Sequence, residues 1–185
     1  EVDVLVLDRE LAIERADEGR TPCHAGQAVD ERLVSELDGV GAPPGPQLPD
    51  TESRLAYLRW LGAMSPRLAR RKVDWQERKE FLQTVWYESK RAGLEPALVL
   101  GLIQVESAFR KFAVSRVGAR GYMQVMPFWS RLIGDGDAGK LFHLQTNLRF
   151  GCVILRHYLD RERGDLFLAL GRYNGSRGKP QYPNA

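Results

Sequence analysis

The stretch that decides the fold runs from residue 103 to residue 127 and reads IQVESAFRKFAVSRVGARGYMQVMP. It sets one carboxylate, Glu106, at the end of an apolar run, and Glu106 is the only acidic residue between Pro96 and Gly134. Apolar surroundings disfavour the ionised form of a carboxyl group, and a general acid needs a proton held near neutral pH. The stretch therefore predicts a catalytic acid at Glu106. The alternative is an ordinary glutamate on a helix surface, the commonest place for this residue.

Three motifs extend the pattern along the chain. Glu106-Ser107 is followed by Ser-x-x-Gly-Ala-x-Gly-x-Met-Gln over residues 115–124 and then by Tyr173-Asn174-Gly175. In this order they resemble the catalytic domain of the soluble lytic transglycosylases, from about Asp74 to the C-terminus. The resemblance implies an all-α, lysozyme-like domain that cleaves bacterial peptidoglycan.

Two positions depart from the usual pattern of that family. Tyr122 stands where the family usually has leucine, which predicts an altered sugar contact. The usual Tyr-Asn-Ala-Gly reads Tyr173-Asn174-Gly175-Ser176, which leaves the shape of the loop after Asn174 open.

The resemblance also implies a mechanism with a single acid. Glu106 would protonate the glycosidic oxygen between N-acetylmuramic acid and N-acetylglucosamine, while the substrate's own N-acetyl group helps to stabilise the cation. Glu106 would then take the proton of the 6-hydroxyl, which closes a 1,6-anhydro ring. Most glycosidases use two carboxylates, but the nearest later candidates, Asp135 and Asp137, lie in a glycine-rich loop that is a poor platform for a fixed nucleophile.

The motifs carry expected roles for further residues. Ser115 is expected beside the acid, and Tyr173 is expected to bring its phenol towards it. Met123 is expected to line the sugar groove, with the protein core as the alternative. Gln124 offers both donors and acceptors for sugar hydroxyls or the N-acetyl amide, and Asn174 is expected to bind sugar. The predicted substrate-binding residues are thus Ser115, Met123, Gln124, Tyr173 and Asn174.

Composition narrows the class of protein. The 185 residues fit one domain with an appendage, and 43% hydrophobic with 28% charged residues is typical of a soluble globular chain. The longest uncharged apolar run, residues 96–105, is too short for the roughly 18–20 residues that span a bilayer. The net charge of +3 is mild, and the basic run at residues 67–72 is more often a solvated face than a nucleic-acid site. We expect no nucleic-acid partner, no metal and no cofactor.

Residues 1–50 differ from the rest of the chain. Val4, Leu7 and Leu11 fit a helical stripe, although the same segment also alternates as a strand does. The Pro/Gly-rich run at residues 39–49 predicts a linker, so we place a boundary between an N-terminal extension (1–50) and a lysozyme-like domain (51–185). The extension could contact a partner in an envelope assembly.

The resemblance implies export to the periplasm or cell wall. The N-terminus shows no signal-peptide features, so we expect a signal that has been removed. Cys23 and Cys152 could then form a disulfide between the extension and the domain. The alternative is two thiols, with Cys152 a small buried residue on a helix.

From residue 51 onward the pattern predicts helices. Pro96 should open the helix that carries Glu106, since proline suits a first helical turn. Later helices are expected at 128–133, 147–163 and 165–172, the last of them capped by Asp165. In the first helix Leu55, Leu58 and Leu61 share one face, and Thr51 or Ser53 is the candidate N-cap. In the second, which Asp74 caps and Gly93 stops, we expect Trp75, Leu82, Val85 and Trp86 to point inward.

Two other functions remain open. A goose-type lysozyme-like hydrolase would share the fold and the single acid but use water. A non-catalytic wall-binding module would use residues 1–50 as a docking arm, and the intact Glu106 argues against it.

Overall fold

The computed structural model describes residue 48 and residues 50–184. In this part of the chain the only extended pairings are two isolated antiparallel bridges, Val114 with Arg120 and Arg120 with Val125. The all-α prediction is therefore confirmed. The predictions for residues 1–47, including the two-part division and Cys23, lie outside the described residues. The helices are α3 (Thr51–Leu68), α4 (Trp75–Arg91), α5 (Pro96–Ser107), α6 (Pro127–Ile133), the 3₁₀ turn η1 (Ala138–Phe142), α7 (Leu144–Arg161) and α8 (Leu166–Tyr173).

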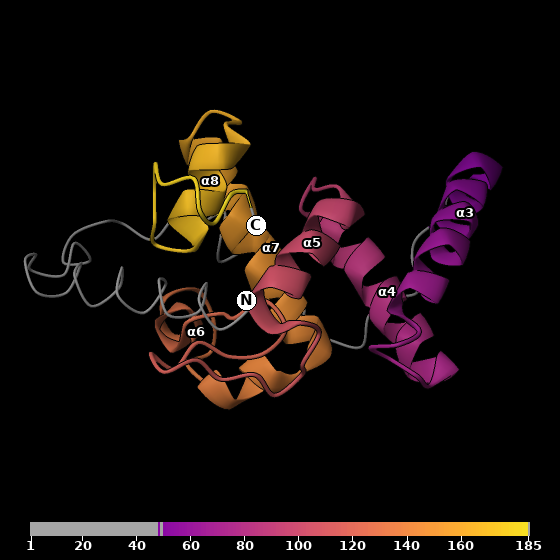
Figure 1. Ribbon diagram of the computed structural model, residues 1–185, viewed down its shortest axis with the longest axis horizontal. Coiled ribbons are helices and arrows are strands. Elements are labelled where there is room, and N and C mark those ends of the chain that lie inside the picture. The colour runs from indigo at the N-terminus through magenta and orange to yellow at the C-terminus, as the bar shows by residue number, and fades with distance from the viewer. Residues whose placement is uncertain (1–47, 49, 185) are drawn as a thin grey trace, which may run out of the picture.

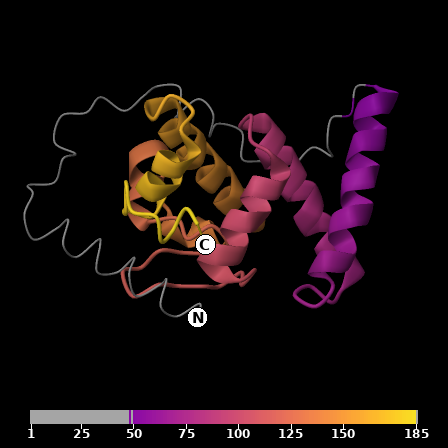
Figure 2. The same ribbon diagram turned by 45° about the horizontal axis from the view of Figure 1, so that its top comes forward.

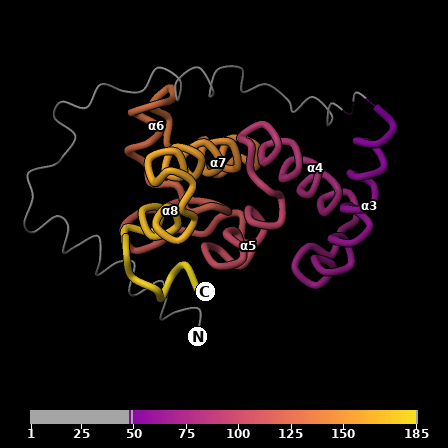
Figure 3. The backbone as a smooth tube through the Cα atoms, turned by 90° about the horizontal axis from the view of Figure 1, so that it is seen from above, coloured from indigo at the N-terminus to yellow at the C-terminus, as the bar shows by residue number. Residues whose placement is uncertain are grey.

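Helix α7 forms the centre of the bundle. It packs against α4, α8 and η1, while α3 contacts α4 at the outer edge of the molecule (Figure 1). The C-terminal segment after α8 runs back towards α5, as the turned view shows (Figure 2). Seen from above, the loop between α5 and α6 lies beneath α7 and α8 (Figure 3). This loop and the C-terminal segment both meet the end of α5.

Aspartates cap three of the helices. Asp50 accepts a hydrogen bond from the Ser53 amide at 2.6 Å, Asp74 from Glu77 at 2.8 Å and Asp165 from Leu168 at 3.0 Å. Side chains of this kind satisfy amides that have no partner within the first helical turn. The caps at Asp74 and Asp165 confirm the prediction, whereas Thr51 and Ser53 were the wrong choice for α3.

The leucine face of α3 is buried only in part. Leu61 is partly buried and packs against the core, whereas Leu55 and Leu58 are 46% and 52% exposed. The helix instead turns its aromatic side chains inward, so that Tyr57 and Trp60 lie 5.4 and 5.1 Å from Trp86 of α4 between ring centroids. Because large rings bury more apolar surface than leucine does, α3 packs against α4 with Tyr57 and Trp60 rather than with Leu55 and Leu58.

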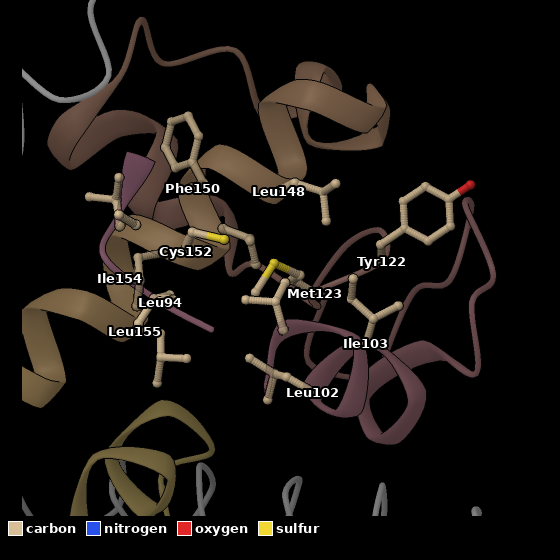
Figure 4. Close-up of a cluster of buried hydrophobic side chains, with 14 of the residues drawn as sticks. Leu94, Leu102, Ile103, Tyr122, Met123, Leu148, Phe150, Cys152, Ile154 and Leu155 are labelled. Carbon is tan, nitrogen blue, oxygen red and sulfur yellow. The ribbon is translucent and has the colours of Figure 1, made fainter. Parts of the chain in front are cut away.

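The core joins α4, α5 and α7. Leu82 and Val85 are fully buried, as predicted, but Trp75 is 46% exposed and was wrongly placed inside. In Figure 4, Met123 reaches from the loop after α5 towards Leu148 and Cys152 of α7. Cys152 is a buried free thiol whose pKa is raised by burial and by the charge of Glu88.

One buried ion pair links two of the core helices. Glu88 of α4 receives hydrogen bonds from Nε and Nη2 of Arg149 on α7, at 3.2 and 3.0 Å. Both side chains are almost fully buried. A buried charge is tolerated only when it is paired in this way, so Glu88 is committed to holding α4 against α7.

Candidate active site

Glu106 lies in the last turn of α5 and is 7% exposed. Its Oε1 accepts a hydrogen bond from the phenol of Tyr182 at 2.5 Å. The helix ends immediately after it, because Ala108 and Phe109 both adopt left-handed backbone conformations, with φ of 49° and 64°. The ring of Phe109 then packs edge-on against Phe81 of α4, 5.9 Å between centroids. The carboxyl group is thus fixed at an abrupt helix end.

Backbone strain gathers at this helix end and in the loop that follows it. Four non-glycine residues in the described part of the chain have positive φ, and three of them are Ala108, Phe109 and Gln124. Such conformations cost about 1–3 kcal/mol each and persist where the surrounding structure enforces them, often at functional sites. Their position supports a functional role for the region next to Glu106.

The C-terminal segment places Tyr182 beside Glu106. Arg177 of this segment binds Glu162 through Nε and Nη2, at 2.7 and 2.9 Å, and Arg172 of α8 binds the same carboxylate. These hydrogen bonds from Arg177 and Arg172 lower the pKa of Glu162 to about 2. The Glu162 carboxylate therefore stays ionised above that pH. Its ion pairs with Arg172 and Arg177 weaken only as the pH falls from the ordinary glutamate range towards 2.

Ser115 closes a tight turn in the loop after α5. Its Oγ accepts from the Ala119 amide at 3.0 Å, and its amide donates to the Ala119 carbonyl at 3.0 Å. Ser115 therefore shapes the loop in the structure. Ser107 hydrogen-bonds back to the Ile103 carbonyl at 3.2 Å, as a helix serine commonly does.

Asn147 holds the segment of residues 120–123 in place. Its Oδ1 accepts from the Met123 amide, and its Nδ2 donates to the carbonyls of Arg120 and Leu141, all at 2.8 Å. The side chain is fully buried. This close contact leaves no room at Gly121, where a β-carbon would lie 2.4 Å from Asn147 Nδ2 and 2.5 Å from the Leu141 carbonyl oxygen.

Met123 and Gln124 are both buried. Met123 is 0% exposed and packs against Gly151 of α7, so the core alternative describes its side chain. Gln124 donates from Nε2 to the carbonyls of Ala113 and Gly121, at 3.1 and 3.0 Å. Its amide thus ties together the two ends of the loop that carries Ser115.

Tyr173 and Asn174 lie at the end of α8. The phenol of Tyr173 donates to the Met123 carbonyl at 2.8 Å, and Asn174 donates from its buried side chain to Ser176 Oγ at 3.1 Å. Ser176, one of the two residues that depart from the usual motif, therefore helps to set the loop after Asn174. The structure brings the second and third sequence motifs together through Met123.

Tyr182 and Asn147 are the site residues that sequence reasoning missed. Tyr182 lies beyond the last motif, in a segment whose only signal is a tyrosine between polar residues and proline. Asn147 lies at the start of a helical stripe that is otherwise apolar. Because buried amides are usually hydrogen-bonded, a bond from its side chain to the backbone could have been expected.

Other acidic residues do not compete with Glu106 in the described part of the chain. The acids with buried side chains there are Glu88, Glu106 and Glu162, of which Glu88 is paired with Arg149 and Glu162 with Arg172 and Arg177. Asp135 and Asp137 are exposed, and Asp135 binds Lys140. The described residues contain no group of three or more histidine, cysteine, aspartate or glutamate side chains that could hold a metal ion. Nor does any described helix have the length and apolar character needed to cross a membrane.

Comparisons with known proteins converge on one kind of domain. Residues 83–183, more than half of the chain, match the family described as Transglycosylase SLT domain. The chain is 33% identical over 103 residues to a transglycosylase of Enterobacteria phage PRD1, covering 56% of this chain and 37% of that protein. It is 49% identical over 85 residues to membrane-bound lytic murein transglycosylase C of Actinobacillus pleuropneumoniae serotype 5b, covering 42% of this chain and 23% of that protein. It thus spans well under half the length of either relative.

A solved structure is also similar to this chain. It is an inactive mutant of the lytic transglycosylase Slt from Pseudomonas aeruginosa, 26% identical, with a TM-score of 0.48, and the match covers 68% of this chain and 22% of that one.

Proposed function

The chain belongs to the Transglycosylase SLT domain family, and on this premise we propose that it is a lytic transglycosylase that cleaves the glycan strands of peptidoglycan. The bond it acts on is the β-1,4 link from N-acetylmuramic acid to N-acetylglucosamine. The observation that carries the proposal is the buried carboxyl group of Glu106, which accepts a hydrogen bond from Tyr182 at the strained end of α5.

Glu106 performs both proton transfers in this proposal. Its carboxyl group first protonates the glycosidic oxygen, so that the bond to the muramic acid carbon breaks and the substrate's N-acetyl group helps to stabilise the cation. The resulting carboxylate then removes the proton of the 6-hydroxyl of the same sugar. That hydroxyl attacks the reacting carbon, because the ring already holds it close, and the product is a 1,6-anhydro end. Water is not consumed, and the acid is returned to its starting form.

Tyr182 orients the acid for these transfers. Its phenol occupies one lone pair of Oε1, so it fixes the carboxyl group in one rotamer and stabilises it when it is ionised after the first transfer. A hydrogen bond to a charged group contributes about 1.5–3 kcal/mol.

The substrate-binding roles follow from where the residues lie. Ser115 and Gln124 shape the loop that follows α5, Tyr173 supports this loop from α8, and Asn174 bonds to Ser176 in the adjoining turn. We propose that this loop forms one wall of the glycan site. Met123 contributes as a packed support beneath the loop, since its side chain is fully buried.

We further propose that the protein acts in the periplasm or at the cell wall, and that residues 1–50 are an extension that contacts an envelope partner.

Replacing Tyr182 by phenylalanine tests the orienting role. We expect Tyr182→Phe to lower kcat by about 10- to 100-fold, since about 1.4 kcal/mol corresponds to a factor of ten. The fold should persist, because the ring still packs. The matched control is Tyr158→Phe, which removes a phenol on α7 that plays no part in the proposed chemistry. Equal rates for Tyr182→Phe and the unchanged protein would contradict the role of Tyr182.

The direct test of the function is digestion of purified peptidoglycan sacculi. Loss of turbidity together with release of soluble muropeptides is the expected result. A folded protein that binds sacculi but releases nothing would favour the wall-binding module instead.

A further inference from the structure

A buried lysine contacts the loop of the active site from the side of α3 and α4. Lys72 lies in the connection between these two helices and is 4% exposed. Its Nζ donates to the phenol oxygen of Tyr122 and to Glu77 Oε1, both at 2.8 Å. Burying an ammonium group is costly unless it is paired. These two bonds provide the pairing, so the lysine is fixed in one place.

We propose that Lys72 is a positioning residue of the active site, which fixes the segment of residues 120–125 against α4 through Tyr122. The proposal rests on the proposed function for its catalytic consequence. The structural part, that Lys72 immobilises this segment, stands independently of it.

The connection that carries Lys72 is itself pinned in place. Arg78 of α4 donates from Nη1 to the carbonyl oxygens of Lys72 and Val73, at 2.5 and 2.9 Å, and from Nε to Ser65 Oγ at 3.0 Å. The backbone of Lys72 is thereby tied to both α3 and α4. The ammonium group therefore reaches Tyr122 from a rigid base.

The segment of residues 120–125 is held on two sides. On one side Tyr122 bonds to Lys72. The amide and carbonyl of the next residue, Met123, bind Asn147 of α7 and Tyr173 of α8. Figure 4 shows the side chains of Tyr122 and Met123 pointing in different directions from this segment. Without the bond to Lys72, the segment would keep its hold on α7 and α8 but lose its polar anchor on the α3–α4 side.

The same lysine lies beside the ring contacts that reach the end of the acid's helix. Its Nζ is 4.9 Å from the ring centroids of both Phe81 and Tyr122, and those rings pack edge-on at 5.0 Å. Phe81 in turn contacts Phe109, three residues after Glu106. Cations over aromatic rings attract them more strongly when water is excluded. Through the Tyr122 ring that it holds against Phe81, Lys72 therefore joins the loop segment and the end of α5 into one packed unit.

Lys72 keeps its charge in this setting. Burial alone would lower its pKa, but the hydrogen bonds from Lys72 to Glu77 and Tyr122 outweigh burial, and the pKa is raised. The ammonium form that makes these contacts is thus the form present at neutral pH.

The pairing depends on the phenol of Tyr122. The leucine that the resemblance leads us to expect at this position could not accept a hydrogen bond from lysine. Tyr122 is 2% exposed, so it does not present the sugar contact predicted from the sequence. Lys72 lies outside residues 83–183, the part that matches the family. The connection between α3 and α4 thereby adds a support from outside the matched part of the chain.

The experiment compares Lys72→Met, Tyr122→Phe, Tyr122→Leu and the double variant Lys72→Met with Tyr122→Leu. The control is Lys90→Met, a lysine with the same kinds of partners, a glutamate at 3.3 Å and an aromatic ring at 5.3 Å, but exposed on α4. Each is assayed on sacculi well below its own Tm, so that rates refer to folded protein. Amide hydrogen exchange of Met123 and Gln124 reports the segment directly.

We expect Lys72→Met and Tyr122→Phe to lower kcat by about 10- to 100-fold with little change in KM, because small displacements at a reacting centre have effects of this size. The Met123 and Gln124 amides should exchange at least about tenfold faster in both variants. Once Tyr122 is leucine, Lys72→Met should lower kcat no further. Lys90→Met should match the unchanged protein in both measurements.

Two results would overturn the proposal. One is a Lys72→Met protein with lowered Tm but unchanged amide exchange and unchanged rate per folded molecule, which would make the lysine a purely structural residue. The other is a further fall in kcat when Lys72→Met is added to Tyr122→Leu, which would mean that Lys72 acts by another route. If the unchanged protein does not digest sacculi, the proposed function fails, and the exchange rates alone decide whether Lys72 holds the segment.

Discussion

Replacing Glu106 by glutamine should abolish the digestion of peptidoglycan while the protein stays folded. Glutamine is nearly the same size and can still accept the hydrogen bond from Tyr182, but it has no acidic proton to give. Loss of general acid catalysis alone lowers a rate by about 10²–10⁴-fold. Glu106 also acts as the base of the second step in our account, so the loss should lie at the upper end of this range. The measurement is the rate of muropeptide release from purified sacculi.

The control for this variant is Glu95→Gln at the start of the same helix. Glu95 has a 79% exposed side chain and makes no side-chain cap bond, so its replacement should leave the rate unchanged. Both variants should keep the far-UV circular dichroism of the unchanged protein. Digestion by a folded Glu106→Gln protein at the original rate would show that another group is the acid.

Replacing Gly121 by alanine should give the largest loss of stability among the changes in the loop. The residue has a φ of 75°, which costs a non-glycine residue about 1–2 kcal/mol. The added β-carbon would also meet Asn147 Nδ2 at 2.4 Å and a backbone carbonyl oxygen at 2.5 Å, and overpacking of this kind costs about 1–3 kcal/mol more. We expect the free energy of unfolding to fall by about 2–5 kcal/mol, measured by urea denaturation.

Gly118 provides a matched control in the same loop. Its φ of 84° is similar, but a β-carbon there would meet nothing within 4 Å. Gly118→Ala should therefore cost only the conformational part, about 1–2 kcal/mol. Equal losses in the two variants would show that the contact with Asn147 does not constrain Gly121.

The sequence was informative wherever local chemistry decides the structure. Asp74, Asp165 and Pro96 mark helix starts by satisfying or avoiding free amides, and each of these predictions is confirmed. The leucine stripe of α3 predicted its buried face only in part, because Leu55 and Leu58 compete with Tyr57 and Trp60, and the outcome depends on the partner Trp86.

The candidate site was only partly predictable for the same reason. Its motifs located Glu106 and the loop, but a motif does not say which way a side chain turns, and Met123 turns into the core. Tyr182 lies 76 residues after the acid that it contacts, and Lys72 lies 50 residues before its partner Tyr122. Contacts over such distances depend on how the helices pack, which no local pattern in the chain records.

The most direct test of the central claim is mass spectrometry of the products released from purified sacculi. One acid serving both steps, with the other buried carboxylates of the described residues paired with arginines, predicts muropeptides that end in 1,6-anhydro-N-acetylmuramic acid. Each would be one water lighter than its hydrolysed counterpart, and none should appear with Glu106→Gln. Recovery of reducing ends alone would contradict the transglycosylase mechanism and make the protein a lysozyme-like hydrolase.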